Sequence, residues 1–164
     1  MQRLALPGAY SWSAWQPDRN LFFSSHLLVR EGGNVAFDPL PLGDDDAREI
    51  ESLGGVATIL LTNRDHARGA AAMRDRFGAR VLAGRREMPL FEMKIDGAFE
   101  DEPVPGIAAI PLDGAKTPGE LAFVIQAFGA AVIGDAVGSV LPVPTFEMAE
   151  TLAGSAWSAT FTAK

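Results

Sequence analysis

The sequence predicts a mixed α/β domain, and three observations lead to this prediction. Short apolar runs bounded by Gly, Pro, Asn or Asp alternate with helix-like segments in the order strand, strand, helix, strand, helix, strand. No linker or internal repeat divides the chain, so we expect one domain over residues 1–164. Apolar residues make up 48% of the chain and charged residues 21%, as is usual for a globular protein.

The first third of the chain predicts a strand followed by a hairpin. Residues 8–16 carry aromatic side chains at nearly alternating positions, which indicates a strand. Residues 21–30 and 35–37 are also strand-like, and the Glu-Gly-Gly-Asn sequence between them is typical of a hairpin turn. The second of these strands ends at Asp38-Pro39, because proline cannot continue a ladder.

The middle of the chain predicts two helices that alternate with buried strands. A helix capped by Asp44, Asp45 and Asp46 is expected to run to about Leu53, because acidic residues suit a helix N-terminus. Residues 56–61 form an apolar run and predict a buried strand. A helix over 68–77 and a short strand over 80–83 follow.

The remaining residues predict more strands and a weakly patterned end. A helical piece is expected over 86–92 and a strand over 107–112. Residues 121–128 and 130–133 predict a second hairpin, around Gly129. A short helix is expected over 146–152.

Composition excludes several classes of function. The net charge is −7 and no basic stripe is present, so we expect no nucleic-acid partner. No apolar run is long enough to cross a membrane, and the N-terminus lacks a signal-peptide pattern, so we expect a cytoplasmic protein. The chain has no cysteine, which rules out thiolate metal sites within it. Of its two histidines, His26 alternates with apolar residues on a predicted strand and is expected to be structural.

Four segments of the chain are distinctive: HLLVREGGNVAFDPLPL, GVATILLTNRDHARGA, IPLDGAKTPGELAFVI and AAVIGDAVG. Together they resemble the metallo-β-lactamase superfamily. The resemblance covers about residues 20–140 and implies an αββα sandwich with a site at one edge between two sheets. Because only a short tail follows the last segment, the C-terminal part of that sandwich is expected to be short or incomplete.

The second segment aligns without gaps on the family's metal motif, Thr-His-x-His-x-Asp-His, but lacks its histidines. With Thr62 on the threonine, His66 falls on a spacer position. The positions of the three histidines and the aspartate are then occupied by Asn63, Asp65, Arg68 and Ala67 respectively.

The two later segments give a similar result. Lys116 stands where the family has the histidine before Thr-Pro-Gly, and Asp135 matches the aspartate that bridges the metals. No histidine follows His66, so the family's last histidine has no counterpart.

A second alignment stays open at this point. Deleting two loop residues places Asp65 and His66 on the family's Asp-His pair, and loops tolerate such changes. Together with Asp135 they would form a three-ligand set for zinc, iron or manganese.

The cations in the gap-free alignment favour a site without metal. Arg68 and Lys116 would repel a divalent ion, and arginine cannot lose its charge in a protein. We therefore hypothesise that an ion-pair cluster of Asp65, Arg68, Lys116 and Asp135 stands in for the metal.

The resemblance implies two functions. The first is a divergent hydrolase of an ester, thioester or lactone. If Asp65, His66 and Asp135 retain a metal, a metal-bound hydroxide would attack the carbonyl; without metal, His66 would act as general base and Lys116 or Arg68 would stabilise the oxyanion. The alternative is a non-catalytic relative that binds a small anion or acts as an oligomerising unit. In either case the partner is a small molecule, and we expect a homo-oligomer such as a dimer. The candidate catalytic residues are Asp65, His66, Arg68, Lys116 and Asp135.

Overall fold

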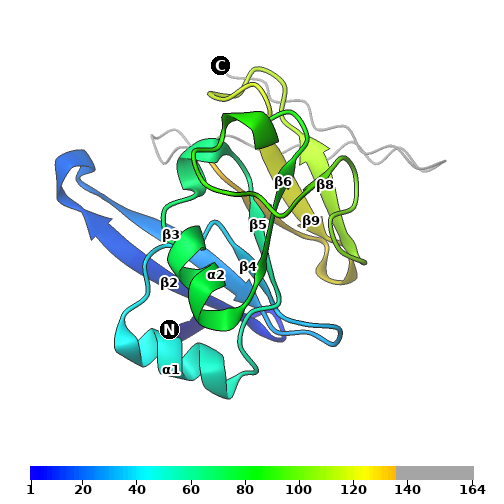
Figure 1. The fold of residues 1–164 in the computed structure, drawn as a ribbon. Coiled ribbons are helices and arrows are strands. Elements are labelled where there is room, and N and C mark those ends of the chain that lie inside the picture. The colour runs from blue at the N-terminus through cyan, green and yellow to red at the C-terminus, as the bar shows by residue number, and fades with distance from the viewer. Residues whose placement is uncertain (136–164) are drawn as a thin grey trace.

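A computed structural model describes residues 1–135 of the chain as two sheets packed face to face, with two helices on the outer face of the larger sheet (Figure 1). This arrangement confirms the predicted α/β class. Neither helix in this part of the chain has the length and apolar character needed to span a membrane. The helix expected over 146–152 lies outside the described residues.

The larger sheet contains seven strands in chain order, β1 to β7. The first four pair antiparallel, whereas β4 to β7 pair parallel. The parallel pairs need long crossover connections, which the helices α1 and α2 supply between β4, β5 and β6. The elements are β1 (Gln2–Arg3), β2 (Ala9–Gln16), β3 (Leu21–Leu28), β4 (Val35–Phe37), α1 (Asp44–Ser52), β5 (Thr58–Leu61), α2 (Ala70–Phe77), β6 (Arg80–Gly84) and β7 (Gly97–Phe99).

The smaller sheet is an antiparallel meander of β8 (Ile107–Pro111), β9 (Leu121–Ile125) and β10 (Ala130–Ile133), with β9 in the centre. A single 3-10 turn and Gly129 join β9 to β10. Gly129 has a φ of 57°, the left-handed conformation that glycine adopts most easily. The predicted second hairpin is therefore confirmed, and β9 ends at Ile125, three residues before the predicted boundary.

Two apolar cores hold these layers together, one on each face of the larger sheet. Ile50 of α1 and Met73 of α2 pack with Trp12, Ile59 and other residues on the helix side. On the opposite face, Phe37 and Phe99 of the larger sheet pack against Phe123 of β9. Alternate residues of each central strand therefore serve opposite cores.

The structure corrects several predicted elements. The strands β1 and β7 were not predicted, because each is very short. The helical piece expected over 86–92 is only a 3-10 turn, Met88–Leu90. In α1 the cap is Gly43, so the three aspartates form the first helical turn and do not cap it. Their charges still lie where the helix dipole favours them.

The second helix begins later than predicted. A 3-10 turn, η2 (Arg64–His66), follows β5, and α2 starts only at Ala70. Gly69 lies against the backbone of Leu40, where a Cβ atom would come within 2.5 Å of the carbonyl oxygen. Residues 62–69 therefore form a loop at the carboxyl end of β5 and are not part of the helix α2.

Candidate functional site

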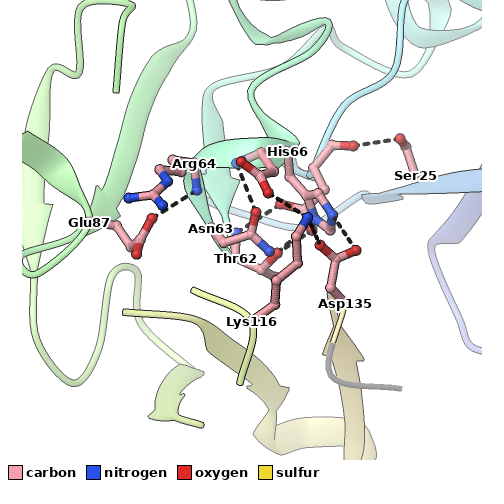
Figure 2. A network of polar contacts seen from close by, with 10 residues as sticks. Ser25, Thr62, Asn63, Arg64, His66, Glu87, Lys116 and Asp135 are labelled. Atoms are coloured by element: carbon pink, nitrogen blue, oxygen red, sulfur yellow. Dashed lines mark hydrogen bonds and ion pairs between the residues drawn. The ribbon is translucent and has the colours of Figure 1, made fainter. Parts of the chain in front are cut away.

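Three strand ends meet where the two sheets come together (Figure 2). Asp38 follows β4 and Thr62 follows β5, and these strands are parallel neighbours. Asp135 follows β10 of the smaller sheet, which brings its carboxylate to the same place. Because the carboxyl ends of parallel strands lie at one edge, polar residues that follow them gather there.

Asp38 is the buried anchor of this site. Its carboxylate accepts hydrogen bonds from the Thr62 backbone N–H (2.8 Å), the Thr62 hydroxyl (2.6 Å) and His66 Nδ1 (2.8 Å). Its φ of 46° is a left-handed conformation, which aspartate tolerates better than most residues. The carboxylate thus ties the end of β4 to the end of β5 and to η2.

His66 is held between two carboxylates. Nδ1 lies 2.8 Å from Asp38, and Nε2 lies 3.0 Å from Asp135. Burial alone would lower the pKa of His66, but the hydrogen bond to Asp38 and the charges of both carboxylates outweigh it, so the pKa is raised. Imidazole can donate from both nitrogens only when it is protonated. Two carboxylates facing the two ring nitrogens therefore favour the protonated form of His66.

Lys116 forms the second cation of the site. Its Nζ lies 2.6 Å from Asp65 Oδ2 and 3.4 Å from Asp135 Oδ2. Figure 2 shows the Lys116 side chain reaching toward His66 and Asp135. The hydrogen bond to Lys116 lowers the pKa of Asp65, and the same bond raises the pKa of Lys116.

Asp135 joins the two cations into one network. One carboxylate oxygen meets His66 and the other meets Lys116. Burial raises the pKa of Asp135, but His66 and Lys116 oppose this effect, and the pKa is lowered overall. We call the five residues Asp38, Asp65, His66, Lys116 and Asp135 the ion-pair cluster.

Arg68 departs from the expected cluster. Within residues 1–135 its guanidinium forms no ion pair, and it lies 4.0 Å from the ring centroid of Phe23 on β3. The reason is that α2 starts after Arg68, so this residue leaves the loop toward β3. Burial lowers the pKa of Arg68, and the nearby charge of Arg19 adds to this effect.

His66, which the gap-free alignment puts at a spacer position, lies at the centre of the cluster, where its ring contacts two carboxylates. Asn63 is the residue that caps η2, by accepting a hydrogen bond from the Asp65 N–H at 2.9 Å. His26 lies apart, on β3 at the wall of an apolar cavity of about 100 Å³.

Three functional residues were missed in the sequence. Asp38 was interpreted only as the end of a strand, and Thr62 only as an alignment anchor. Glu87 is almost fully buried and accepts hydrogen bonds from the Arg64 and Gly119 N–H groups. An aspartate directly after a buried strand was a usable signal for Asp38, whereas Glu87 lies in a stretch without any clear pattern.

Comparison with known proteins gives the family. The profile described as the metallo-β-lactamase superfamily matches residues 1–157. The chain belongs to this superfamily. No curated protein matches the chain. The match to the profile confirms the resemblance that the four segments predicted.

Solved structures of the superfamily share the fold at low identity. A metallo-β-lactamase from Cronobacter sakazakii with a HARLDQ motif, in a variant carrying arginine-, glutamine- and lysine-to-histidine substitutions, is 22% identical with a TM-score of 0.60. The alignment covers 80% of this chain and 62% of that one, so our chain spans less than two thirds of its length. A metallo-β-lactamase from Pontibacter korlensis is 13% identical with a TM-score of 0.62, covering 76% and 66% of the two chains.

A third solved structure contains bound metal. It is in a di-iron-bound form, is 18% identical with a TM-score of 0.55, and the alignment covers 66% of this chain and 64% of that one. At this identity, the similarity shows a shared fold and nothing about metal binding by our chain.

The donor set of the ion-pair cluster does not fit a metal ion. Metal ligands must be deprotonated, and histidine must be neutral. In this superfamily member, both His66 nitrogens are engaged with carboxylates, and Asp65 and Asp135 already share the Lys116 ammonium. Across residues 1–135, no three His, Cys, Asp or Glu side chains are grouped so that they could hold a metal.

Proposed function

We propose that the ion-pair cluster takes the place of the metal centre in this superfamily member, and that the chain binds a small anion instead of hydrolysing through a metal-bound hydroxide. The observation that carries the proposal is the position of the Lys116 ammonium, 2.6 Å from Asp65 and 3.4 Å from Asp135. At this position, a cation that belongs to the chain itself neutralises the carboxylates that could otherwise bind a divalent ion.

The contacts within the cluster argue against hydrolysis by His66 or Lys116. A general base needs a ring nitrogen free to accept a proton from water, but both His66 nitrogens lie against carboxylates, and these carboxylates favour its protonated form by raising its pKa. An oxyanion needs an uncompensated donor, whereas the charge of Lys116 is shared by two carboxylates. Neither candidate for hydrolytic chemistry is therefore available in this arrangement.

Two arginines beside the cluster supply the charge for an anion. The guanidinium carbons of Arg68 and Arg19 lie 4.0 Å and 5.7 Å from the ring centroid of Phe23. A cation–π contact holds a guanidinium without consuming its N–H donors. Within the described part of the chain, neither side chain forms an ion pair. Guanidinium groups suit carboxylate and phosphate oxygens, which supports an oxyanion as the ligand.

Metal content tests the proposal. We expect purified protein, dialysed against zinc, iron or manganese, to retain only substoichiometric metal by elemental analysis, and to leave ester, thioester and lactone substrates unhydrolysed. The Lys116→His variant replaces the internal cation with a metal ligand and should retain more zinc than wild type. Lys94→His is the matched control, because Lys94 lies outside the cluster and contacts Asp96. Stoichiometric metal in the wild-type protein would overturn the proposal.

A further inference from the structure

A buried carboxylate outside the ion-pair cluster links the two loops that carry it. Glu87 is 1% exposed and follows β6. Its Oε2 accepts the Arg64 N–H at 3.1 Å, and its Oε1 accepts the Gly119 N–H at 3.0 Å. Figure 2 shows the carboxylate beside Arg64, on the far side of the loop from His66.

The two N–H groups belong to the loops that carry the Asp65–Lys116 ion pair. Arg64 immediately precedes Asp65, and Gly119 follows Lys116 by three residues. One carboxylate oxygen serves each loop, so the length of the carboxyl group sets the distance between them. Glu87 is itself fixed to the end of β6, because its N–H donates to the Gly84 carbonyl at 3.0 Å.

Gly119 gives independent support for a close approach. A Cβ atom at this position would lie 2.6 Å from Glu87 Cγ and 3.0 Å from Arg86 Cβ. The loop of Lys116 therefore reaches Glu87 only because residue 119 has no side chain. Elsewhere the loops are joined by one backbone bond, from the Leu121 N–H to the Thr62 carbonyl at 2.9 Å, at the strand ends.

We propose that Glu87 is a positioning residue, which holds the 62–68 and 113–120 loops at the separation that lets Lys116 reach Asp65 and Asp135. Glu87 contacts no member of the ion-pair cluster through its side chain and acts through the two backbones. This inference deepens the proposed function, because it names what fixes the internal cation in place.

Glu87→Gln tests the role at constant shape. A carboxylate accepts two N–H groups, but an amide offers one oxygen and turns an NH2 group toward the other donor. One loop is therefore released. The readout is the acetylation rate of each lysine at low conversion, measured by mass spectrometry of the folded chain. A lysine held in an ion pair reacts slowly, because it stays protonated.

We expect Glu87→Gln to raise the acetylation rate of Lys116 severalfold, because a lysine released from its ion pairs is deprotonated more easily and reaches the reagent more often, while Lys94 in the same molecule keeps its rate. Asp96→Asn is the matched control. Asp96 also accepts a backbone N–H, from Val81 at 2.9 Å, but in a different loop. This control should leave the rate of Lys116 unchanged.

If Glu87→Gln does not fold, Gly119→Ala pushes the same contact apart from the opposite side. A folded variant of either kind whose Lys116 reacts at the wild-type rate overturns the inference. An equal acceleration of Lys94 and Lys116 also overturns it, because that result reports general loosening. Failure of the proposed function would be seen in a different experiment. Stoichiometric metal in the wild-type protein would refute the proposal that Lys116 takes the place of the metal. A faster reaction of Lys116 alone in Glu87→Gln would still support Glu87 as a positioning residue.

Discussion

Asp135 is the residue on which the charges of the site converge. Its two oxygens meet one cation each, His66 at 3.0 Å and Lys116 at 3.4 Å. The carboxylates of Asp38 and Asp65 complete the cluster on either side. With three carboxylates and two cations, the cluster keeps a negative balance, and an added anion has no reason to enter it. The arginines on Phe23 are the better place for an anion.

Arg68→Gln tests this assignment at the level of a single side chain. We expect it to weaken the binding of inorganic phosphate about tenfold or more, because a hydrogen bond to a charged group contributes about 1.5–3 kcal/mol. NMR titration of the labelled protein measures the affinity. Arg48→Gln is the control, since Arg48 pairs with Asp45 on the exposed face of α1. Equal weakening in both variants would point to a general effect of net charge.

At the level of elements, Asp38 connects three of them. It follows β4, accepts hydrogen bonds from the N–H and the hydroxyl of Thr62 at the end of β5, and orients His66 in η2. The Ser25 hydroxyl donates to the Asp38 carbonyl at 2.6 Å, which adds β3 to the same junction. The carboxyl ends of β4 and β5 are thus held together by polar contacts of one side chain.

Asp38→Asn keeps the size of the side chain and its tolerance of the left-handed conformation, but it removes the charge. One of the three donors then faces an NH2 group. We expect a loss of about 1–3 kcal/mol in the free energy of unfolding, as for other buried donors left without an acceptor. Urea denaturation gives this value. Asp75→Asn, at an exposed position on α2, should change it little.

The sequence predicted the regular elements better than the site. The hairpin of β3 and β4, the helix α1 and the strands β5 and β10 follow from periodicity and turn residues, which are local signals. Asp65, Lys116 and Asp135 were found because the resemblance aligns them, and the structure brings them together. The contacts of His66 with Asp38 and Asp135 could not be predicted, since they join residues 28 and 69 positions apart. The contacts of Glu87 could not be predicted either, because they join residues 23 and 32 positions apart.

At the scale of the whole molecule, the histidines couple stability to pH in opposite directions. The pKa of His66 is raised above 6.5, so its contribution to stability is complete below that pH and disappears as the pH rises through its folded pKa. Burial lowers the pKa of His26, so its neutral form is favoured and stability falls as the pH drops below 6.5. Asp135, with a lowered pKa, contributes above pH 3.8 and less in acid.

Comparison of variants separates these effects. The free energy of unfolding of wild type minus that of His66→Asn should decrease as the pH rises above 6.5. Wild type minus His26→Asn should instead decrease as the pH falls below 6.5. Subtraction cancels groups that do not contact the substituted histidine, such as the Met1 amine, whose pKa is raised by Asp46 and Glu49. Denaturation over a pH series measures both differences. A pH-independent difference for His66→Asn would contradict an imidazolium in the cluster.

The expected homo-oligomer stays a prediction. The β2–β3 hairpin projects from the larger sheet (Figure 1), and it carries Trp15 and Phe22, which are 45% and 66% exposed with ring centroids 4.9 Å apart. This aromatic pair is an exposed apolar patch on the described part of the chain, a kind of surface that often makes protein contacts.

The close approach of Gly134 constrains how this site can evolve. A Cβ atom at that position would lie 2.5 Å from Thr62 Oγ1 and 3.1 Å from His66 Cε1. Any larger residue there would need compensating changes at Thr62 or His66, which are themselves tied to Asp38. We therefore expect a substitution at Gly134 to be tolerated only together with a change at Thr62 or His66.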